Sequence, residues 1–189
     1  EKLWTYGGRI ERDLEFGPTL SMTLGAEGRY DDISEVGLYQ TVRGRRFAER
    51  GVFAVDESSA ALFAEATWKP ADRLSLYAGL RGDTFRFKTR AKSANAWSGT
   101  VNDSIVSPKL GASFEPAEGV ALYANWGEGY HSNDARGVTE PTTPAPGLVK
   151  GEGHEVAVRF ERYGVVATAT YWWMDVDSEL VYAGDAGSV

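Results

Sequence analysis

A short run near the middle of the chain, His131-Ser132-Asn133-Asp134, combines the residue types of a hydrolase triad and of a metal site. A triad needs side chains that converge on one point, whereas adjacent residues of an extended segment point apart. Imidazole and carboxylate are also good metal ligands, so a metal or chelate contact by His131 and Asp134 is an open alternative. We favour a structural role for this run in anchoring a loop, and we expect no catalytic residue.

A second group of acidic residues lies near the end of the chain. Asp175, Asp177 and Glu179 are spaced by two, but the later ligands and the placed glycine of a calcium loop do not follow them. The sequence also contains no zinc spacing and no glycine-rich phosphate loop. We therefore interpret the acidic group as solvated charge and expect no resident metal or cofactor.

Other charged residues recur at every second position. Glu27, Arg29 and Asp31 form one such set, and Arg81 and Asp83 form another. Residues two apart lie on one face of a β-strand, where opposite charges compensate one another. If that face lines a lumen, the sequence predicts a hydrophilic wall rather than a dedicated ligand site. The predicted lumen-facing residues are Glu27, Arg29, Glu65, Arg81, Asp83, Lys109, Glu155 and Arg159.

Long strands are needed to carry such a wall, and the hydrophobic pattern predicts them. Between Leu20 and Tyr30 apolar and polar residues alternate with a period of two. The strand is close to the ~9 to 11 residues that a tilted strand needs to cross a bilayer. We predict strands at 3–14, 20–30, 60–68, 74–83, 107–114, 120–131, 155–160 and 165–173.

The connections between these strands alternate in length. Short turns at 16–18, 69–73, 115–119 and 161–164 alternate with long polar loops at 31–56, 88–103 and 132–147. Outer-membrane barrels place short turns in the periplasm and long loops outside, with aromatic girdles at both interfaces. Aromatic residues lie toward the predicted strand ends, namely Trp68, Trp126, Tyr130, Tyr171 and Trp173. The pattern predicts an all-β, antiparallel up-and-down transmembrane β-barrel, with a soluble β-sandwich or lipocalin-like barrel as the alternative.

Composition narrows the class of protein. The formal charge of the 189 residues is -7, which argues against a nucleic-acid partner. No stretch approaches the ~20 apolar residues of a membrane helix, and the absence of cysteine excludes disulfides. The mean hydropathy of -0.34 does not exclude a transmembrane barrel, because averaging removes the alternation of apolar and polar residues along each strand. Because the chain begins and stops within strand-like patterns, we expect it to be a fragment of a longer protein.

Three segments resemble the barrel region of TonB-dependent outer-membrane receptors. They are SPKLGASFEP from Ser107, LYANWGEGYHSNDARG from Leu122 and WWMDVDSELVYAGDAG from Trp172. EVAVR from Glu155 stands where the family usually has glutamate-x-glycine-x-arginine. The resemblance implies a 22-stranded barrel with an N-terminal plug that imports scarce nutrients, often iron chelates or cobalamin, with energy delivered from the inner membrane.

On this resemblance, residues 1–189 are about eight strands of such a barrel in a Gram-negative outer membrane, without the plug. The implied partners are membrane lipid, a small-molecule or metal-chelate ligand such as a ferric siderophore, and the energy-coupling TonB protein acting through the plug. The lumen wall would also dock the plug. Because the family holds its ligand with plug apices and outer loops, location alone nominates Arg43, Arg45, Arg46, His131, Asp134 and Arg136.

Two other readings stay open at this point. A complete eight-stranded barrel with a structural or adhesive role predicts closure between the first and last strands. A soluble all-β binding module predicts folding in water without detergent. An enzyme is the class that we expect least.

Overall fold

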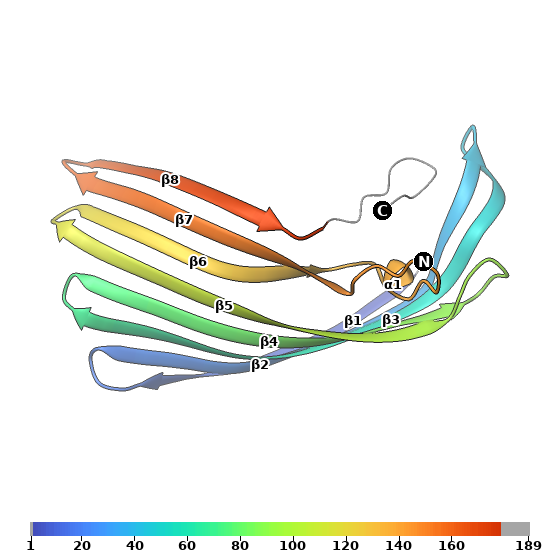
Figure 1. Cartoon of the computed structure of the whole chain (residues 1–189), viewed down its shortest axis with the longest axis horizontal. Coiled ribbons are helices and arrows are strands. Elements are labelled where there is room, and N and C mark those ends of the chain that lie inside the picture. The colour runs from blue at the N-terminus through green and yellow to red at the C-terminus, as the bar shows by residue number, and fades with distance from the viewer. Residues whose placement is uncertain (1, 179–189) are drawn as a thin grey trace.

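Eight long antiparallel strands form one curved sheet in the computed structural model, which describes residues 2–178 (Figure 1). Their spatial order follows the chain, from β1 at one edge to β8 at the other. The strands are β1 (Leu3–Glu15), β2 (Leu20–Val42), β3 (Arg45–Ala71), β4 (Leu74–Ala91), β5 (Gly99–Ala117), β6 (Val120–Ser132), β7 (Leu148–Arg162) and β8 (Val165–Val176). One short helix, α1 (Ala135–Val138), precedes β7. The predicted all-β, up-and-down architecture is confirmed.

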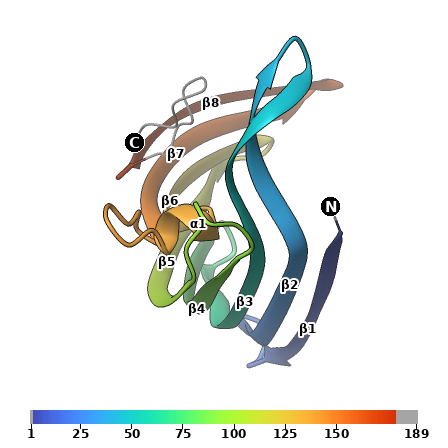
Figure 2. The same cartoon turned by 90° about the vertical axis from the view of Figure 1, so that its right-hand side faces the viewer.

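The sheet is an open arc. In the described part of the chain, β1 pairs with β2 alone and β8 pairs with β7 alone. The arc curves around α1, which lies on its concave side (Figure 2). A closed eight-stranded barrel would require β1 and β8 to pair, so the described strands form an open sheet and not a complete small barrel. No helix within residues 2–178 is long and apolar enough to cross a membrane.

The two faces of the arc differ in chemistry because the side-chain period is two. We call the face that carries α1 the inner face and the opposite one the outer face. The register aligns Leu24 with Ala64 and Ala64 with Leu80 on the outer face. Leu24 and Leu80 are 42% and 54% exposed, so this face presents apolar side chains to its surroundings. The predicted apolar face is therefore present on β2, β3 and β4.

The predicted long loop at 31–56 is wrong. β2 and β3 continue through it as a paired hairpin that turns at Arg43 and Gly44, both with positive φ (49° and 77°), as a two-residue hairpin turn requires. The register shifts three times along this hairpin, between Ile33 and Val36 and again on either side of Gln40. Each shift resets the alternation, which explains why the sequence pattern looked irregular.

Two further expectations need correction. The predicted loop at 88–103 shortens to residues 92–98, because β4 runs to Ala91 and β5 begins at Gly99. Tyr130, predicted in the aromatic girdle, turns to the inner face instead, where its ring meets Phe85 edge to face at 5.8 Å. The pairing of β6 with β5 ends at Lys109 and Gly127, before Tyr130. The loop predicted at 132–147 is present and contains α1.

The buried core lies on the inner face near the loops. Residues of β3 and β4 pack there against α1 and the start of β7. Phe87 is fully buried at its centre, and Phe53, Val55, Ala135, Val138 and Leu148 surround it. Among residues 2–178, no such buried cluster covers the end of the sheet nearer the short turns.

Candidate functional site

A row of linked charged side chains crosses the inner face on the half of the sheet nearer the short turns. Arg81 donates to Asp83 (Nη2 to Oδ1, 2.9 Å) and to Glu27 (Nη1 to Oε2, 3.2 Å). Glu27 also lies 3.7 Å from Arg9, which donates to Glu11 at 2.8 Å. We call these five residues the charge network. Its alternating signs extend across β1, β2 and β4, so each charge has an opposite neighbour.

The charge network rests on an aromatic ring of the intervening strand. The Arg9 guanidinium lies 4.5 Å from the centre of the Phe63 ring, and that of Arg81 lies 5.9 Å away. Cations attract the electron-rich face of such a ring. Phe63 therefore supports the two arginines between the carboxylates.

The other predicted wall residues also lie among paired polar groups. Arg29 bonds Asp31 at 2.7 Å, and Arg159 bonds Glu161 at 2.6 Å, each within its own strand. Asn125 donates to Glu155 at 3.0 Å. Glu65 and Lys109 flank Gly79 in the register.

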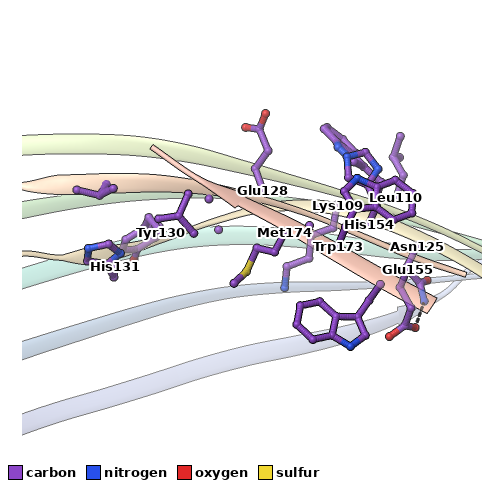
Figure 3. Close-up of a pocket in the computed structure, with 18 of the residues that line it drawn as sticks. Lys109, Leu110, Asn125, Glu128, Tyr130, His131, His154, Glu155, Trp173 and Met174 are labelled. Atoms are coloured by element: carbon purple, nitrogen blue, oxygen red, sulfur yellow. Dashed lines mark hydrogen bonds between the residues drawn. The ribbon is translucent and has the colours of Figure 1, made fainter. Parts of the chain in front are cut away.

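A strip without side chains crosses β6 and β7 beside these groups. Gly127 pairs with Gly153, and Gly129 pairs with Gly151. The strip forms the floor of an open depression of about 740 Å³, in which the bonded pair Asn125 and Glu155 lies at one end and His131 at the other (Figure 3). Exposed backbone of this kind lets another segment or molecule approach the wall closely.

The segment from residue 133 to 147, which we call the inward loop, folds back onto the inner face. Its ends are tied where Asn133 donates from its backbone N–H to Gly147 O and from Nδ2 to Pro146 O, both at 2.9 Å. A side chain at Gly147 would place its Cβ 2.8 Å from Phe87, so this close approach requires glycine. Asp103 of β5 accepts a hydrogen bond from the next backbone N–H, that of Leu148, at 3.0 Å.

Thr139 connects the inward loop to the wall. Its hydroxyl donates to Ala135 O at 2.8 Å and shares a 2.7 Å hydrogen bond with the buried hydroxyl of Thr89 on β4. The indole N–H of Trp97 also donates to the Thr139 hydroxyl oxygen, at 3.2 Å. Three segments thus meet at one buried hydroxyl, which fixes the position of α1.

Asp134 and Arg136 are the charged pair at the start of α1. Asp134 accepts hydrogen bonds from the backbone N–H of Arg136 (2.8 Å) and from its Nε (2.9 Å). Burial opposes ionisation of Asp134, but the hydrogen bonds and charge of Arg136 outweigh burial and hold the pKa of Asp134 below its ordinary value. The carboxylate therefore caps the helix in its ionised form.

The predicted ligand residues fall into three places. Asp134 and Arg136 lie together on the inward loop, whereas Arg43, Arg45 and Arg46 lie at the tip of the β2–β3 hairpin, which projects away from α1 (Figures 1 and 2). Arg46 stacks there on Tyr39 at 4.1 Å. His131 is exposed at the end of β6, and Asp134 bonds Arg136.

The described residues contain no group of three or more potential metal ligands. Glu179 of the acidic group, and the resembling segment beyond Ser178, lie outside the described residues.

Sequence reasoning missed several residues of this face. Arg9 and Glu11 have the same spacing of two as the predicted charged sets, so that signal could have found them. Thr89, Trp97 and Thr139 carry no comparable signal, because their meeting depends on how the inward loop folds.

The chain is similar to proteins of a known family. The model of the family "TonB dependent receptor-like, beta-barrel" matches residues 2–189. No relative among curated protein sequences matches the chain.

Solved structures share the fold. The FrpB iron transporter from Neisseria meningitidis (F3-3 variant) is 17% identical with a TM-score of 0.68, and the match covers 92% of this chain and 28% of that one. The copper transporter OprC is 16% identical with a TM-score of 0.71, covering 92% and 30%. The Serratia marcescens hemophore receptor HasR, as a double mutant in complex with its hemophore HasA and heme, is 19% identical with a TM-score of 0.67, covering 93% and 33%. The chain thus spans about a third of the length of these proteins.

Proposed function

The chain belongs to the TonB dependent receptor-like β-barrel family, and we propose on this basis that it forms part of the barrel wall of an outer-membrane receptor that imports a scarce nutrient, such as a ferric siderophore or another metal chelate. The observation that carries the proposal is the family match over residues 2–189. The fold shared with iron, copper and heme-related proteins supports a nutrient of this general kind.

The outer face supports a place in the membrane. Its apolar side chains begin near Trp68 at the short turns and give way to polar ones near Ser58, about ten residues along β3. At ~3.4 Å per residue and a tilt of ~40°, this stretch is roughly 26 Å tall, close to the apolar band of ~25 Å on outer-membrane barrels. Lipid of a Gram-negative outer membrane is accordingly the partner of this face.

The inner face supports a wetted wall that also docks a plug. Its charges are already paired with one another, so a docking domain would meet a balanced surface rather than a concentrated charge. The glycine strip on β6 and β7 allows close approach of that domain. Through the plug, the intact receptor would receive energy from the TonB protein.

The inward loop is the proposed ligand-facing element of this part of the barrel. It holds Asp134 and Arg136 above the lumen in a fixed position, because the buried core and Thr139 anchor it. Arg43, Arg45 and Arg46 would contact an arriving ligand earlier, at the tip of the β2–β3 hairpin. His131 lies at the rim between β6 and the inward loop.

Uptake by the intact receptor tests this function. We would express the full-length protein in a strain without its own copy and measure accumulation of labelled ferric chelates, copper and heme, with and without TonB. We expect saturable, TonB-dependent uptake of one of these nutrients. A receptor that is missing from the outer-membrane fraction, or that imports none of them, would contradict the proposal.

A variant pair tests the ligand-facing element. Arg136→Gln should raise the half-saturating nutrient concentration by about tenfold, a loss comparable with removing one charged hydrogen bond. Arg162→Gln, at the last residue of β7 beside the short turn, removes the same charge and should leave uptake unchanged. Equal uptake by both variants would remove the inward loop from the ligand path.

A further inference from the structure

The outer face of β2 to β5 contains an open groove of about 830 Å³. Its floor is made of small residues, Ala26, Ala60 and Gly82, and Leu62 and Leu80 rise beside them. A Cβ at Gly82 would meet no atom within 4 Å, so no side chain of the described chain fills the space above it. The groove is apolar and lies on the face that the proposed function assigns to lipid.

The chemistry of the outer face changes stepwise from this groove toward the loops. The register places Thr84 beside Ala60, one row beyond Gly82. Arg86 follows in the next row beside Ser58, and Lys88 in the row after that beside Asp56. An apolar groove, a row with a hydroxyl and two rows with a basic side chain thus succeed one another within seven residues of β4, from Gly82 to Lys88. We call the two rows of Arg86 and Lys88 together the basic row.

The two basic side chains have no partner of opposite charge in the described residues. Asp56 is engaged by Arg90, which forms two hydrogen bonds with it. Arg86 and Lys88 form no hydrogen bond or ion pair among residues 2–178. They line a hollow of about 180 Å³ with Tyr30, Ser58 and Asp56, whose carboxylate charge Arg90 compensates. Phosphate oxygens are strong acceptors for such cations, and arginine can bind them in bidentate fashion.

We propose that this surface binds a phosphorylated lipid of the outer leaflet, with its acyl chains in the groove and its phosphate at Arg86 and Lys88. The proposal rests on the membrane placement argued above, and it is separate from nutrient import on the inner face. A lipid fits this surface better than a free anion does, because the apolar groove continues directly into the basic row. Arg86 also lies at the height expected for a lipid phosphate, because it is beside Ser58 at the end of the roughly 26 Å apolar stretch.

Lipid retention by the intact receptor tests the basic row. The purified full-length protein would be titrated in detergent with bisphosphorylated lipid A, with its dephosphorylated form and with inorganic phosphate, and bound lipid would be counted by native mass spectrometry. We expect Arg86→Gln/Lys88→Gln to weaken binding of the phosphorylated lipid at least tenfold, to the level of the dephosphorylated one. Lys69→Gln/Arg73→Gln, at the other end of the same two strands, removes the same charge and should retain the lipid.

A second variant pair tests the groove and separates a lipid from a free anion. Gly82→Leu fills the groove and should weaken lipid binding, whereas Gly8→Leu, which also lies on open outer surface of β1, should not. Equal losses from both charge-removing variants would overturn the proposal in favour of general attraction. Displacement of the lipid by millimolar inorganic phosphate, with no effect of Gly82→Leu, would overturn it in favour of a simple anion site.

Measurements on the same preparations distinguish a failure of the proposed import function from a failure of the proposed lipid site. Heat-modifiable migration in gels reports whether each variant is a folded barrel. A receptor absent from the outer-membrane fraction overturns the proposed function, whereas a receptor that is present and binds both lipid forms equally overturns only the lipid site.

Discussion

Toward the short turns, the inner face is a single layer of sheet whose side chains pair with one another, whereas toward the loops the same strands lie beneath the inward loop. Arg9 and Glu27 of the first region are half exposed, with 53% and 39% of their side chains accessible. Phe87 of the second region is fully buried. One set of strands therefore supports both a wetted wall and a small folded core.

The difference separates stability from surface chemistry. Exposed ion pairs contribute ~0 to 1 kcal/mol each, because water screens them and side-chain entropy opposes them. Removing a large buried apolar side chain costs ~2 to 5 kcal/mol, and leaving a buried hydrogen-bonding group unsatisfied costs ~1 to 3 kcal/mol. We infer that the covered region fixes the position of Asp134 and Arg136, while the open region sets the polarity of the wall.

The largest effect is expected from matched phenylalanine substitutions in the two regions. Phe87→Ala should lower the free energy of opening of the inward loop by ~3 to 5 kcal/mol, since it leaves a cavity at the centre of the buried cluster. Phe63→Ala removes the same ring roughly 20 Å away along β3 and should leave that opening unchanged. Hydrogen exchange of residues 133–147 in the intact receptor measures both. Faster exchange in Phe63→Ala would mean that the two regions are coupled.

The buried hydroxyl of Thr139 is expected to have the next largest effect. Thr139→Val keeps the shape but leaves the Trp97 N–H and the Thr89 hydroxyl without their acceptor, which should weaken loop attachment by ~1 to 3 kcal/mol. Thr139→Ser retains the hydroxyl and is the control. Exchange of the Val138 amide, which bonds Asp134 O at 3.0 Å, reports the change. Equal protection in the valine and serine variants would show that the hydrogen bonds add nothing.

The helix cap at Asp134 should make loop attachment depend on pH. The pKa of Asp134 is lowered in the folded loop, so its ionised form contributes stability above the ordinary value of ~3.9, and this contribution is lost as the pH falls through the lower folded value. We expect constant protection of residues 135–138 from pH 8 to 5 and a decline below about pH 4. Asp134→Asn should lose up to ~1 kcal/mol at neutral pH and remove most of the acid dependence. An unchanged profile in that variant would exclude the cap as the cause.

Period-two alternation made the open region largely predictable from sequence. It predicted the strands and placed Glu27 and Arg81 on the polar faces of their strands, because the face of a side chain in a strand depends on local spacing alone. The family resemblance from Ser107 to Gly137 agrees with the family match over residues 2–189. Which of the paired charges meets a plug or a ligand stays a prediction.

The covered region could not be predicted in the same way. The extension of β2 and β3 beyond residue 31 was not predicted, because register shifts near Ile33 and Gln40 break the alternation locally. The return of the inward loop onto Phe87 depends on contacts between residues more than 45 positions apart, such as Thr89 with Thr139. Contacts of that kind leave no periodic signal along the chain.

The smallest effect is expected in the charge network, and it completes the contrast between the two regions. Glu27→Gln removes the carboxylate between Arg9 and Arg81 but leaves each arginine its other partner, Glu11 or Asp83. Since the groups are partly solvated, we expect a cost below ~1 kcal/mol in receptor stability and none in loop protection. Raising the salt concentration should reduce even this difference, because screening weakens the native pairs. A larger, salt-independent loss, measured by thermal unfolding in detergent, would mean that the open wall is itself a structural core and that the two regions stabilise the barrel in the same way.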